Sequence, residues 1–241
     1  MIKRVRFATR KADIDSDNFA VTWLETASAV AADCPDGARP LRATLCTSVP
    51  GIIDVQKHDG VDLQWFSDID HLERFDRWQA TVALEPVADR LRRVLDYDAS
   101  PVIVVDEAIL RGADWLEQRW RWGGVRLKHM AIARRAAGLS PAEFSERWRR
   151  RAGTLKRSGS AQAIPIPKEA LGNAYIQNHP IARGAGEWAY DAFNEVYFDE
   201  LEDLRRRSDW FVESLGTGTE DDLVSQNWFL AASEEVLISG P

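Results

Sequence analysis

The sequence contains few of the residues that form disulfides or bind metals. Only two cysteines, Cys34 and Cys46, and four histidines occur among its 241 residues. Two cysteines are too few for a disulfide framework and lack the spacing of a metal site, which is compatible with free thiols in a reducing cytoplasm. The histidines also lack metal-ligand spacing such as His-x3-His. We therefore predict neither a disulfide framework nor a metal site.

Long apolar runs and signal sequences are absent too. No run approaches the roughly 18 residues that a membrane-spanning helix requires, and residues 1–11 lack the apolar core of a signal peptide. The net charge is −7 and the pI is near 5.2. The arginines in residues 147–151 form one basic cluster on one helix, whereas a nucleic-acid-binding domain presents a basic face. We expect a soluble, cytoplasmic protein with no membrane or nucleic-acid partner.

Motifs that bind common cofactors are missing as well. The sequence has no phosphate-cradling glycine loop, no dinucleotide-binding fingerprint and no serine or cysteine nucleophile motif. We therefore predict no cofactor, and any chemistry must come from ordinary acid and base side chains.

The most informative feature that is present is an internal repeat. Residues 3–27 share a pattern with residues 128–152 without a gap, each position corresponding to the one 125 further along. The chain therefore contains two copies of one unit. The identical pairs are Lys3/Lys128, Ala8/Ala133, Arg10/Arg135, Ala12/Ala137, Phe19/Phe144, Trp23/Trp148 and Ala27/Ala152.

Each copy begins with a strand, a turn and a helix. Val5 and Phe7 alternate with arginines, and the second copy alternates in the same way, which is typical of a strand with two different faces. Asp15 and Ser140 are the expected N-caps of the two helices, and Ser140 is followed by proline and, three residues after the cap, by Glu143. Two aromatic residues on each helix share a face, which we expect to pack inward.

The rest of each half continues the repeat. Both halves have the order β-α-β-β-α-β of a ferredoxin-like unit. One such unit leaves a sheet face bare, so we predict an α+β fold in which two units pair within one chain into a dimeric α/β barrel. The further predicted strands are 39–49, 59–66 and 101–110 in the first half and 173–181, 191–198 and 227–238 in the second, and the predicted second helices are 69–95, with a break near Pro86, and 201–215.

The predicted domain boundaries follow from the repeat. The first ferredoxin-like unit covers residues 1–112, and the second covers residues 125–241. The connector, residues 113–124, is rich in tryptophan and ends in two glycines, which favours a packed helix over a flexible linker.

The second half resembles a known family. The run K-x-x-x-x-A-R-R-x-x-G-L-S-x-x-E-F-x-x-x-W from Lys128 is followed by AYIQNHPI, by YDAFNEVYFDELEDL and by EEV. This half is similar to the EthD-like branch of the dimeric α/β-barrel superfamily, and the first half is a weaker second copy. The resemblance implies a small hydrophobic or aromatic substrate, since relatives include polyketide cyclases, decarboxylases, dehydratases and cofactor-free oxygenases. Related barrels also bind haem, which no motif here demands.

The two halves retain the family's polar residues unequally. Where the family pattern places a histidine in the first helix, this chain has Ala152, and the first copy has Ala27. The third-strand glutamate is kept as Glu195 but is Leu63 in the first half, and the second-strand histidine is His179. We therefore expect the functional pocket in the C-terminal half and a largely structural N-terminal half.

Four residues are candidates for acid-base catalysis. His179 ends the second strand at the expected barrel mouth, and His129 on the first strand is either a hydrogen-bonded core histidine or borders a cavity. Glu195 and Tyr197 share a face of the third strand that we place between strand and helices. Burial there would raise the pKa of Glu195 toward that of a general base, and a salt bridge to an arginine such as Arg134 is the alternative.

The hypothesised reaction is proton transfer on a small aromatic or polyketide-like molecule, as in a cofactor-independent lyase, isomerase or cyclase. His179 or His129 abstracts a proton next to a carbonyl, and Glu195 orients the histidine. Tyr197 or Tyr175 then stabilises the enolate. The predicted substrate-binding residues are Tyr175, Asn178, Asn194, Trp148, Arg4 and Arg6.

Rival hypotheses remain open from the sequence. A cofactor-free monooxygenase would use the same pocket with oxygen, and a non-catalytic accessory protein would hold its ligand unchanged. Arg4 and Arg6 could instead bind a substrate carboxylate in the first half. We expect His58 and His71 at the surface, and the protein to be a monomer or a homodimer.

Overall fold

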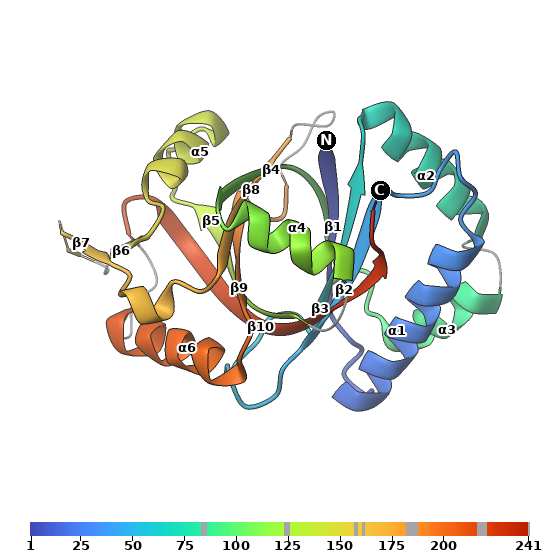
Figure 1. The fold of residues 1–241 in the computed structure, drawn as a ribbon, viewed down its shortest axis with the longest axis horizontal. Coiled ribbons are helices and arrows are strands. Elements are labelled where there is room, and N and C mark those ends of the chain that lie inside the picture. The colour runs from blue at the N-terminus through green and yellow to red at the C-terminus, as the bar shows by residue number, and fades with distance from the viewer. Residues whose placement is uncertain are drawn as a thin grey trace.

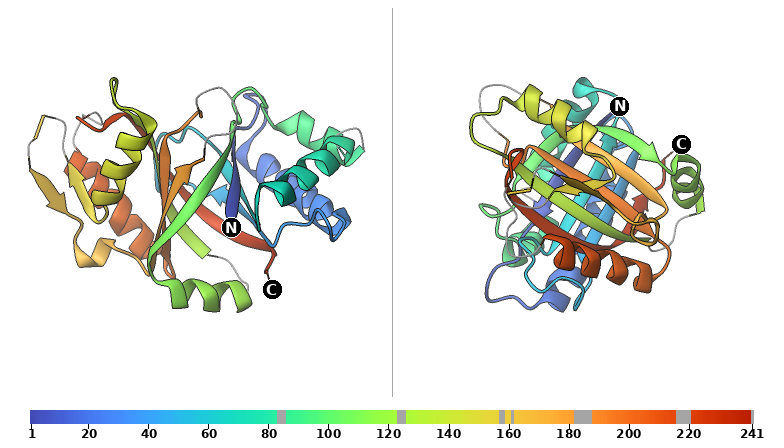
Figure 2. Two further views of the ribbon diagram at one scale, coloured as in Figure 1. Left: turned by 90° about the horizontal axis from the view of Figure 1, so that it is seen from above. Right: turned by 90° about the vertical axis from the view of Figure 1, so that its left-hand side faces the viewer.

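Eight antiparallel strands close into a barrel, and the helices lie on its outside (Figure 1, Figure 2). The computed structural model describes residues 1–82, 86–122, 126–156, 159–160, 162–181, 188–215 and 221–240. The order of strands around the barrel is β1-β3-β2-β10-β5-β9-β8-β4. These strands are β1 (Ile2–Ala8), β2 (Arg42–Ser48), β3 (Gly60–Phe66), β4 (Val102–Arg111), β5 (Arg126–Arg135), β8 (Ala174–Pro180), β9 (Ala192–Phe198) and β10 (Val224–Ile238).

The two halves of the chain contribute equally to the barrel. In each half the four strands are neighbours, and the barrel closes because β4 pairs with β8 and β10 pairs with β2. A small hairpin of β6 and β7 stands apart from the barrel. The remaining elements are α1 (Ser16–Asp33), α2 (Ile69–Val82), α3 (Pro86–Val94), α4 (Ala113–Trp122), α5 (Pro141–Arg150), β6 (Thr154–Lys156), β7 (Ala163–Pro165), the short 3-10 helix Lys168–Ala170 and α6 (Leu201–Leu215).

The observed elements lie close to the predicted ones. The prediction of a mixed helix and strand protein is confirmed, and the expected break near Pro86 separates α2 from α3. The boundaries of the two predicted domains stay a prediction, and Gly123 and Gly124 of the predicted connector lie outside the described residues. No helix in the described part of the chain is both long and apolar enough to cross a membrane.

Both predicted helix starts are confirmed. The carboxylate of Asp15 accepts a hydrogen bond from the backbone N–H of Asn18 at 2.8 Å. Ser140 and Glu143 form a complete capping box, in which each side chain accepts from the backbone N–H of the other. Since these caps fix where each helix begins, they also fix which face reaches the sheet. The buried aromatic residues of those faces are Phe19, Trp23, Phe144 and Trp148.

The barrel interior has an apolar part and a charged part. Alternate residues of every strand point inward, so that Val5 and Phe7 meet Met130, Ile132 and Phe193 in one buried cluster. Toward the other end the inward residues are charged. Helix α4 packs its buried residues Leu116 and Trp120 against β8 and β9 beside this charged part, and it crosses in front of the barrel in Figure 1.

Candidate functional site

The predicted catalytic residues do not form one site. Glu195 and Tyr197 point into the barrel, whereas His129 and His179 lie on the outer face of the same sheet. The placement of Glu195 and Tyr197 between strand and helices is therefore wrong. Because the strands are covered on both faces, alternation shows that two faces differ but not which one faces the helices. The hypothesis that Glu195 orients either histidine is excluded by this geometry.

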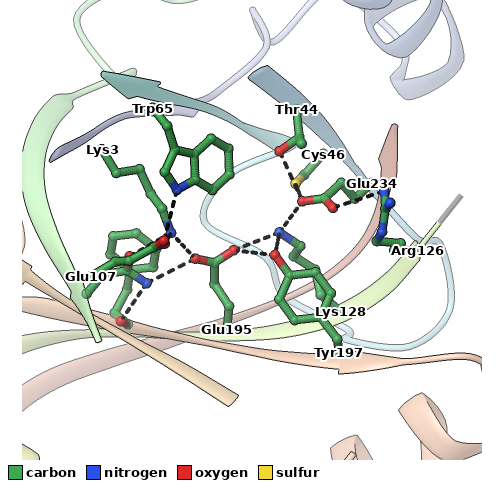
Figure 3. Close-up of polar contacts among 12 residues, drawn as sticks. Lys3, Thr44, Cys46, Trp65, Glu107, Arg126, Lys128, Glu195, Tyr197 and Glu234 are labelled. Atoms are coloured by element: carbon green, nitrogen blue, oxygen red, sulfur yellow. Dashed lines mark hydrogen bonds and ion pairs between the residues drawn. The ribbon is translucent and has the colours of Figure 1, made fainter. Parts of the chain in front are cut away.

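Glu195 is the centre of a buried ion network (Figure 3). One carboxylate oxygen accepts from Lys3 Nζ at 2.7 Å, and the other accepts from Lys128 Nζ at 2.7 Å. Burial alone would raise the pKa of Glu195, but the two ammonium groups hold that pKa well below its usual range. The carboxylate is thus ionised and engaged, so the expected raised pKa is wrong and the salt-bridge alternative is right, with lysines in place of an arginine.

The network repeats across the two halves. Lys3 forms an ion pair with Glu107 at 2.5 Å, and Lys128 forms one with Glu234 at 2.5 Å. Glu195 joins the two pairs, because both lysines bind it. Burial opposes the charge of each lysine, yet the acidic neighbours raise the pKa of both above the usual value. These groups hold the two halves together at the barrel centre.

Two other predicted residues belong to this network. The amide of Asn178 accepts a hydrogen bond from Lys3 at 2.8 Å and donates one to Glu195 at 3.0 Å. The Tyr197 hydroxyl accepts from Lys128 at 3.0 Å and donates to Glu195 at 3.2 Å. Their polar groups are therefore occupied inside the protein, and the structure does not bring them to a cavity with the histidines.

The two candidate histidines are buried and neutral. His129 is 1% exposed and packs its ring against Phe211 and Phe229. Burial, together with the positive charge of nearby Arg207, lowers its pKa far below the usual value. His179 contacts α5, where it accepts from Arg149 Nε at 3.3 Å, and burial lowers its pKa to about 4.

The expectation that His58 and His71 are exposed is wrong. His58 is 3% exposed, and its two ring nitrogens contact the hydroxyls of Thr9, at 2.8 Å, and of Tyr190. His71 is 6% exposed, and its Nε2 donates to the carbonyl of Arg39 at 2.9 Å. Both are placed by contacts between elements that are distant in the sequence.

Each half has a cavity between the outer face of its sheet and its helices. The N-terminal cavity, among β1, β2, β3, α1, α2 and α3, has a volume of about 440 Å³. The C-terminal cavity, among β8, β9, β10, α5, α6 and β6, has a volume of about 80 Å³. Pockets for drug-sized ligands occupy about 300 to 1,000 Å³. Of these two cavities, the N-terminal one is in that range and the C-terminal one is below it.

The N-terminal cavity combines an apolar wall with two opposite charges. Arg6 on β1 and Asp62 on β3 are register partners on adjacent strands, so both side chains point toward the helices. Both are half-buried and line the cavity. The apolar part of the wall comes from Trp23, Ala27, Val30, Ala31, Phe75, Leu91 and Leu237.

These two charges are available to a ligand. Within the described residues, neither the Asp62 carboxylate nor the Arg6 guanidinium has a hydrogen-bond or ion-pair partner. The guanidinium of Arg6 lies 5.5 Å from the ring of Tyr97. Burial raises the pKa of Asp62 although Arg4 and Arg6 oppose the shift. A carboxylate with a raised pKa, next to a cation and an apolar wall, is suited to proton transfer.

Arg4, the other arginine predicted to bind substrate, is already engaged. Its guanidinium donates to Gln64 at 3.0 Å and to Gln79 at 2.9 Å, and it lies 3.4 Å from Asp76. These three partners line the cavity but Arg4 does not, whereas Arg6 does.

The remaining predicted substrate-binding residues meet at the C-terminal cavity. Tyr175, Asn194 and Trp148 all line it. The indole N–H of Trp148 donates to the Asn194 side-chain oxygen at 3.0 Å, and Gln177 donates to the Tyr175 hydroxyl at 3.0 Å. The structure thus brings these residues together, in a space too small for an aromatic substrate.

Sequence reasoning missed Asp62. Its signal was present in the strand GVDLQWF, where Asp62 is the acidic residue on the face opposite Val61 and Leu63. Pairing this strand with β1 would have placed it beside Arg6. No group of three or more histidine, cysteine or acidic side chains in the described ranges is arranged to hold a metal ion.

Comparison with known proteins adds no assignment. No known family profile matches the chain, and no curated protein matches it. The candidate site therefore rests on its own geometry.

Proposed function

We infer that each half of the chain is a ferredoxin-like unit and that the two units form an intramolecular dimeric α/β barrel of the EthD-like kind. Two features support this. The barrel strands and α-helices of each half follow the order strand, helix, strand, strand, helix region, strand, and in each half the first and third barrel strands lie between the second and fourth. The gapless repeat of residues 3–27 and 128–152 points the same way.

We propose that the protein is a cofactor-independent lyase, isomerase or cyclase that acts on a small, largely apolar carbonyl compound in the N-terminal cavity. One observation carries the proposal: Asp62 and Arg6 line a cavity of about 440 Å³, and neither has a hydrogen-bond or ion-pair partner among the described residues. Both charges are half-buried beside an apolar wall, an arrangement typical of a ligand pocket with a few convergent polar groups.

The proposed chemistry follows from the two charges. The Asp62 carboxylate removes a proton from the carbon next to a carbonyl group, and its raised pKa makes it a stronger base than an ordinary aspartate. The electron pair of the broken C–H bond moves to the carbonyl oxygen, where Arg6 stabilises the developing negative charge. In a ketone with a β,γ double bond the electron pair is shared with that double bond, and return of the proton to the γ-carbon completes an isomerisation. This role replaces His179, His129, Glu195 and Tyr197 in the hypothesis.

The test is a substrate screen read by proton exchange. Small aromatic and polyketide-like ketones are incubated with the protein in D2O, and loss of the proton next to the carbonyl is followed by NMR. We expect exchange to fall by about 10² or more in Asp62→Asn and Arg6→Met. Asp209→Asn, at an exposed aspartate of α6, is the matched control and should keep the wild-type rate.

The same screen separates the rival functions. Turnover without oxygen supports the proposed reaction, and a strict requirement for oxygen would indicate a monooxygenase. Tight binding with neither exchange nor turnover would indicate an accessory protein. Wild-type exchange in Asp62→Asn, with the variant folded, would remove Asp62 as the base.

A further inference from the structure

The C-terminal cavity contains a buried arginine that lacks a counterion. Arg207 on α6 is 4% exposed and lines this cavity. Its Nη1 donates a hydrogen bond to the carbonyl of Ala170 at 2.6 Å, and its Nε has no hydrogen-bond partner among the described residues. Its guanidinium lies 4.7 Å from the ring of Phe211. No described carboxylate lies within ion-pair distance.

The other cations around the cavity are neutralised. Arg151 pairs with Asp221, and Lys156 pairs with Asp222 at 2.7 Å. Arg207 therefore differs from them in having no acidic partner. A buried charge without a partner is strongly destabilising, and an anion bound beside it would remove that cost.

The polar groups near Arg207 complete a site for negative charge. The Tyr175 hydroxyl accepts from Gln177 at 3.0 Å, which leaves its own proton for another acceptor. The oxygen of the Asn194 amide is taken by Trp148 at 3.0 Å, which leaves its NH2 group as a donor. Planar carboxylates pair well with a guanidinium and such donors.

Volume limits the ligand to very few atoms. The cavity holds about 80 Å³, well below the roughly 300 Å³ at which sites for drug-sized ligands begin. We propose that this cavity is a binding site for a small carboxylate of the size of formate or acetate, held by Arg207 with Tyr175 and Asn194. The site is separate from the N-terminal cavity and does not depend on the function proposed there.

Calorimetric titration with acetate tests the site. We expect saturable binding by the wild-type chain, at least about tenfold weaker binding by Arg207→Met, and unchanged binding by Arg206→Met. Arg206 is the matched control, because it is the exposed neighbour on the same helix. Equal affinity in Arg207→Met and the wild type, or no binding by the wild type, would overturn the proposal.

Additional measurements keep the test decisive if Arg207→Met does not fold. Tyr175→Phe removes one hydroxyl and should weaken acetate binding about three- to tenfold. Benzoate should not bind at this cavity, and phosphate should bind more weakly than acetate. Tighter binding of phosphate would refute the carboxylate assignment. Asp62→Asn should bind acetate like the wild type, which separates this proposal from the one for the N-terminal half.

Discussion

The two halves share a framework but differ in the space between sheet and helices. At corresponding positions of the second strand, β2 has Ala43 where β8 has Tyr175, and both side chains face their helices. The small residue leaves a cavity of about 440 Å³ in the N-terminal half, whereas the aromatic ring, Arg207 and Phe211 leave about 80 Å³ in the other half. Side-chain size on a repeated framework therefore decides how much space remains between sheet and helices in each half.

In the barrel interior it is the C-terminal half that provides a group which the N-terminal half lacks. Lys3 with Glu107 and Lys128 with Glu234 are equivalent pairs, while the central Glu195 has Leu63 as its counterpart. The C-terminal half thus supplies the one carboxylate that both lysines need. The C-terminal half therefore contributes more to the shared core, while the N-terminal half contains the larger cavity.

The largest expected effect on stability comes from giving position 195 the residue found at the corresponding position of the N-terminal half. Glu195→Leu copies Leu63 and leaves Lys3 and Lys128 buried with one carboxylate fewer. Removal of one partner of a buried ion pair costs about 3–5 kcal/mol, so the free energy of unfolding should fall by that amount in a urea titration. Glu235→Leu, on the exposed side of β10, should change it by less than about 0.5 kcal/mol. Equal effects would show that the network does not stabilise the barrel.

Lowering the pH should reduce the free energy of unfolding, because both halves contain buried histidines with a lowered pKa. Burial lowers the pKa of His58 to about 3 and of His179 to about 4, from 6.5, and it also lowers the pKa of His129 well below 6.5. A lowered pKa means that the unfolded chain binds more protons, so stability is present above pH 6.5 and falls as the pH drops toward the folded-state values.

One substitution measures how much of this acid sensitivity comes from His129. His129→Leu removes a histidine of the C-terminal half and should reduce the slope of unfolding free energy against pH by about 1.4 kcal/mol per pH unit below pH 6.5. The measurement is a series of urea titrations from neutral pH downward. An unchanged slope would mean that His129 is protonated in the folded protein. At still lower pH, protonation of Glu195 should add to the loss, because its pKa is also lowered.

Filling the larger cavity should abolish the difference between the two halves in their ability to bind an aromatic ligand. Ala27 on α1 lines the N-terminal cavity, and Ala152 is its counterpart in the repeat. Ala27→Phe should weaken binding of a small aromatic carboxylate by at least about tenfold, while changing stability by less than about 1.5 kcal/mol because the space is open. Ala152→Phe should leave that affinity unchanged. Fluorescence titration of both variants gives the answer, and equal loss in the two would place the ligand elsewhere.

Local sequence signals predicted much of the fold but little of the site. Asp15 and Ser140 marked where helices begin, and period-2 alternation located the strands, because both depend on neighbours along the chain. The direction of Glu195 depended instead on which face of a doubly covered sheet lies inside the barrel. The burial of His58 depended on Tyr190, which is 132 residues away in the sequence. Such contacts arise only when the barrel closes.

The smallest expected effect on the free energy of unfolding comes from removing either helix cap. Ser140→Ala removes a reciprocal capping box, whereas Asp15→Ala removes a single accepting side chain. Each should lower the free energy of unfolding by about 1 kcal/mol, with the larger loss at Ser140. Thermal and urea unfolding of both variants checks the order. A reversed order would show that the capping box adds nothing beyond one side-chain bond.

The central claim is that the N-terminal cavity, between Asp62, Arg6 and the helices, is the ligand site. The most direct test is a crystal structure of the protein with para-iodobenzoate, whose iodine gives an anomalous signal. The account predicts an iodine peak among Trp23, Phe75 and Leu237, with the carboxylate on Arg6, and no peak after Ala27→Phe. An iodine peak in the C-terminal half, with the N-terminal cavity empty, would contradict it.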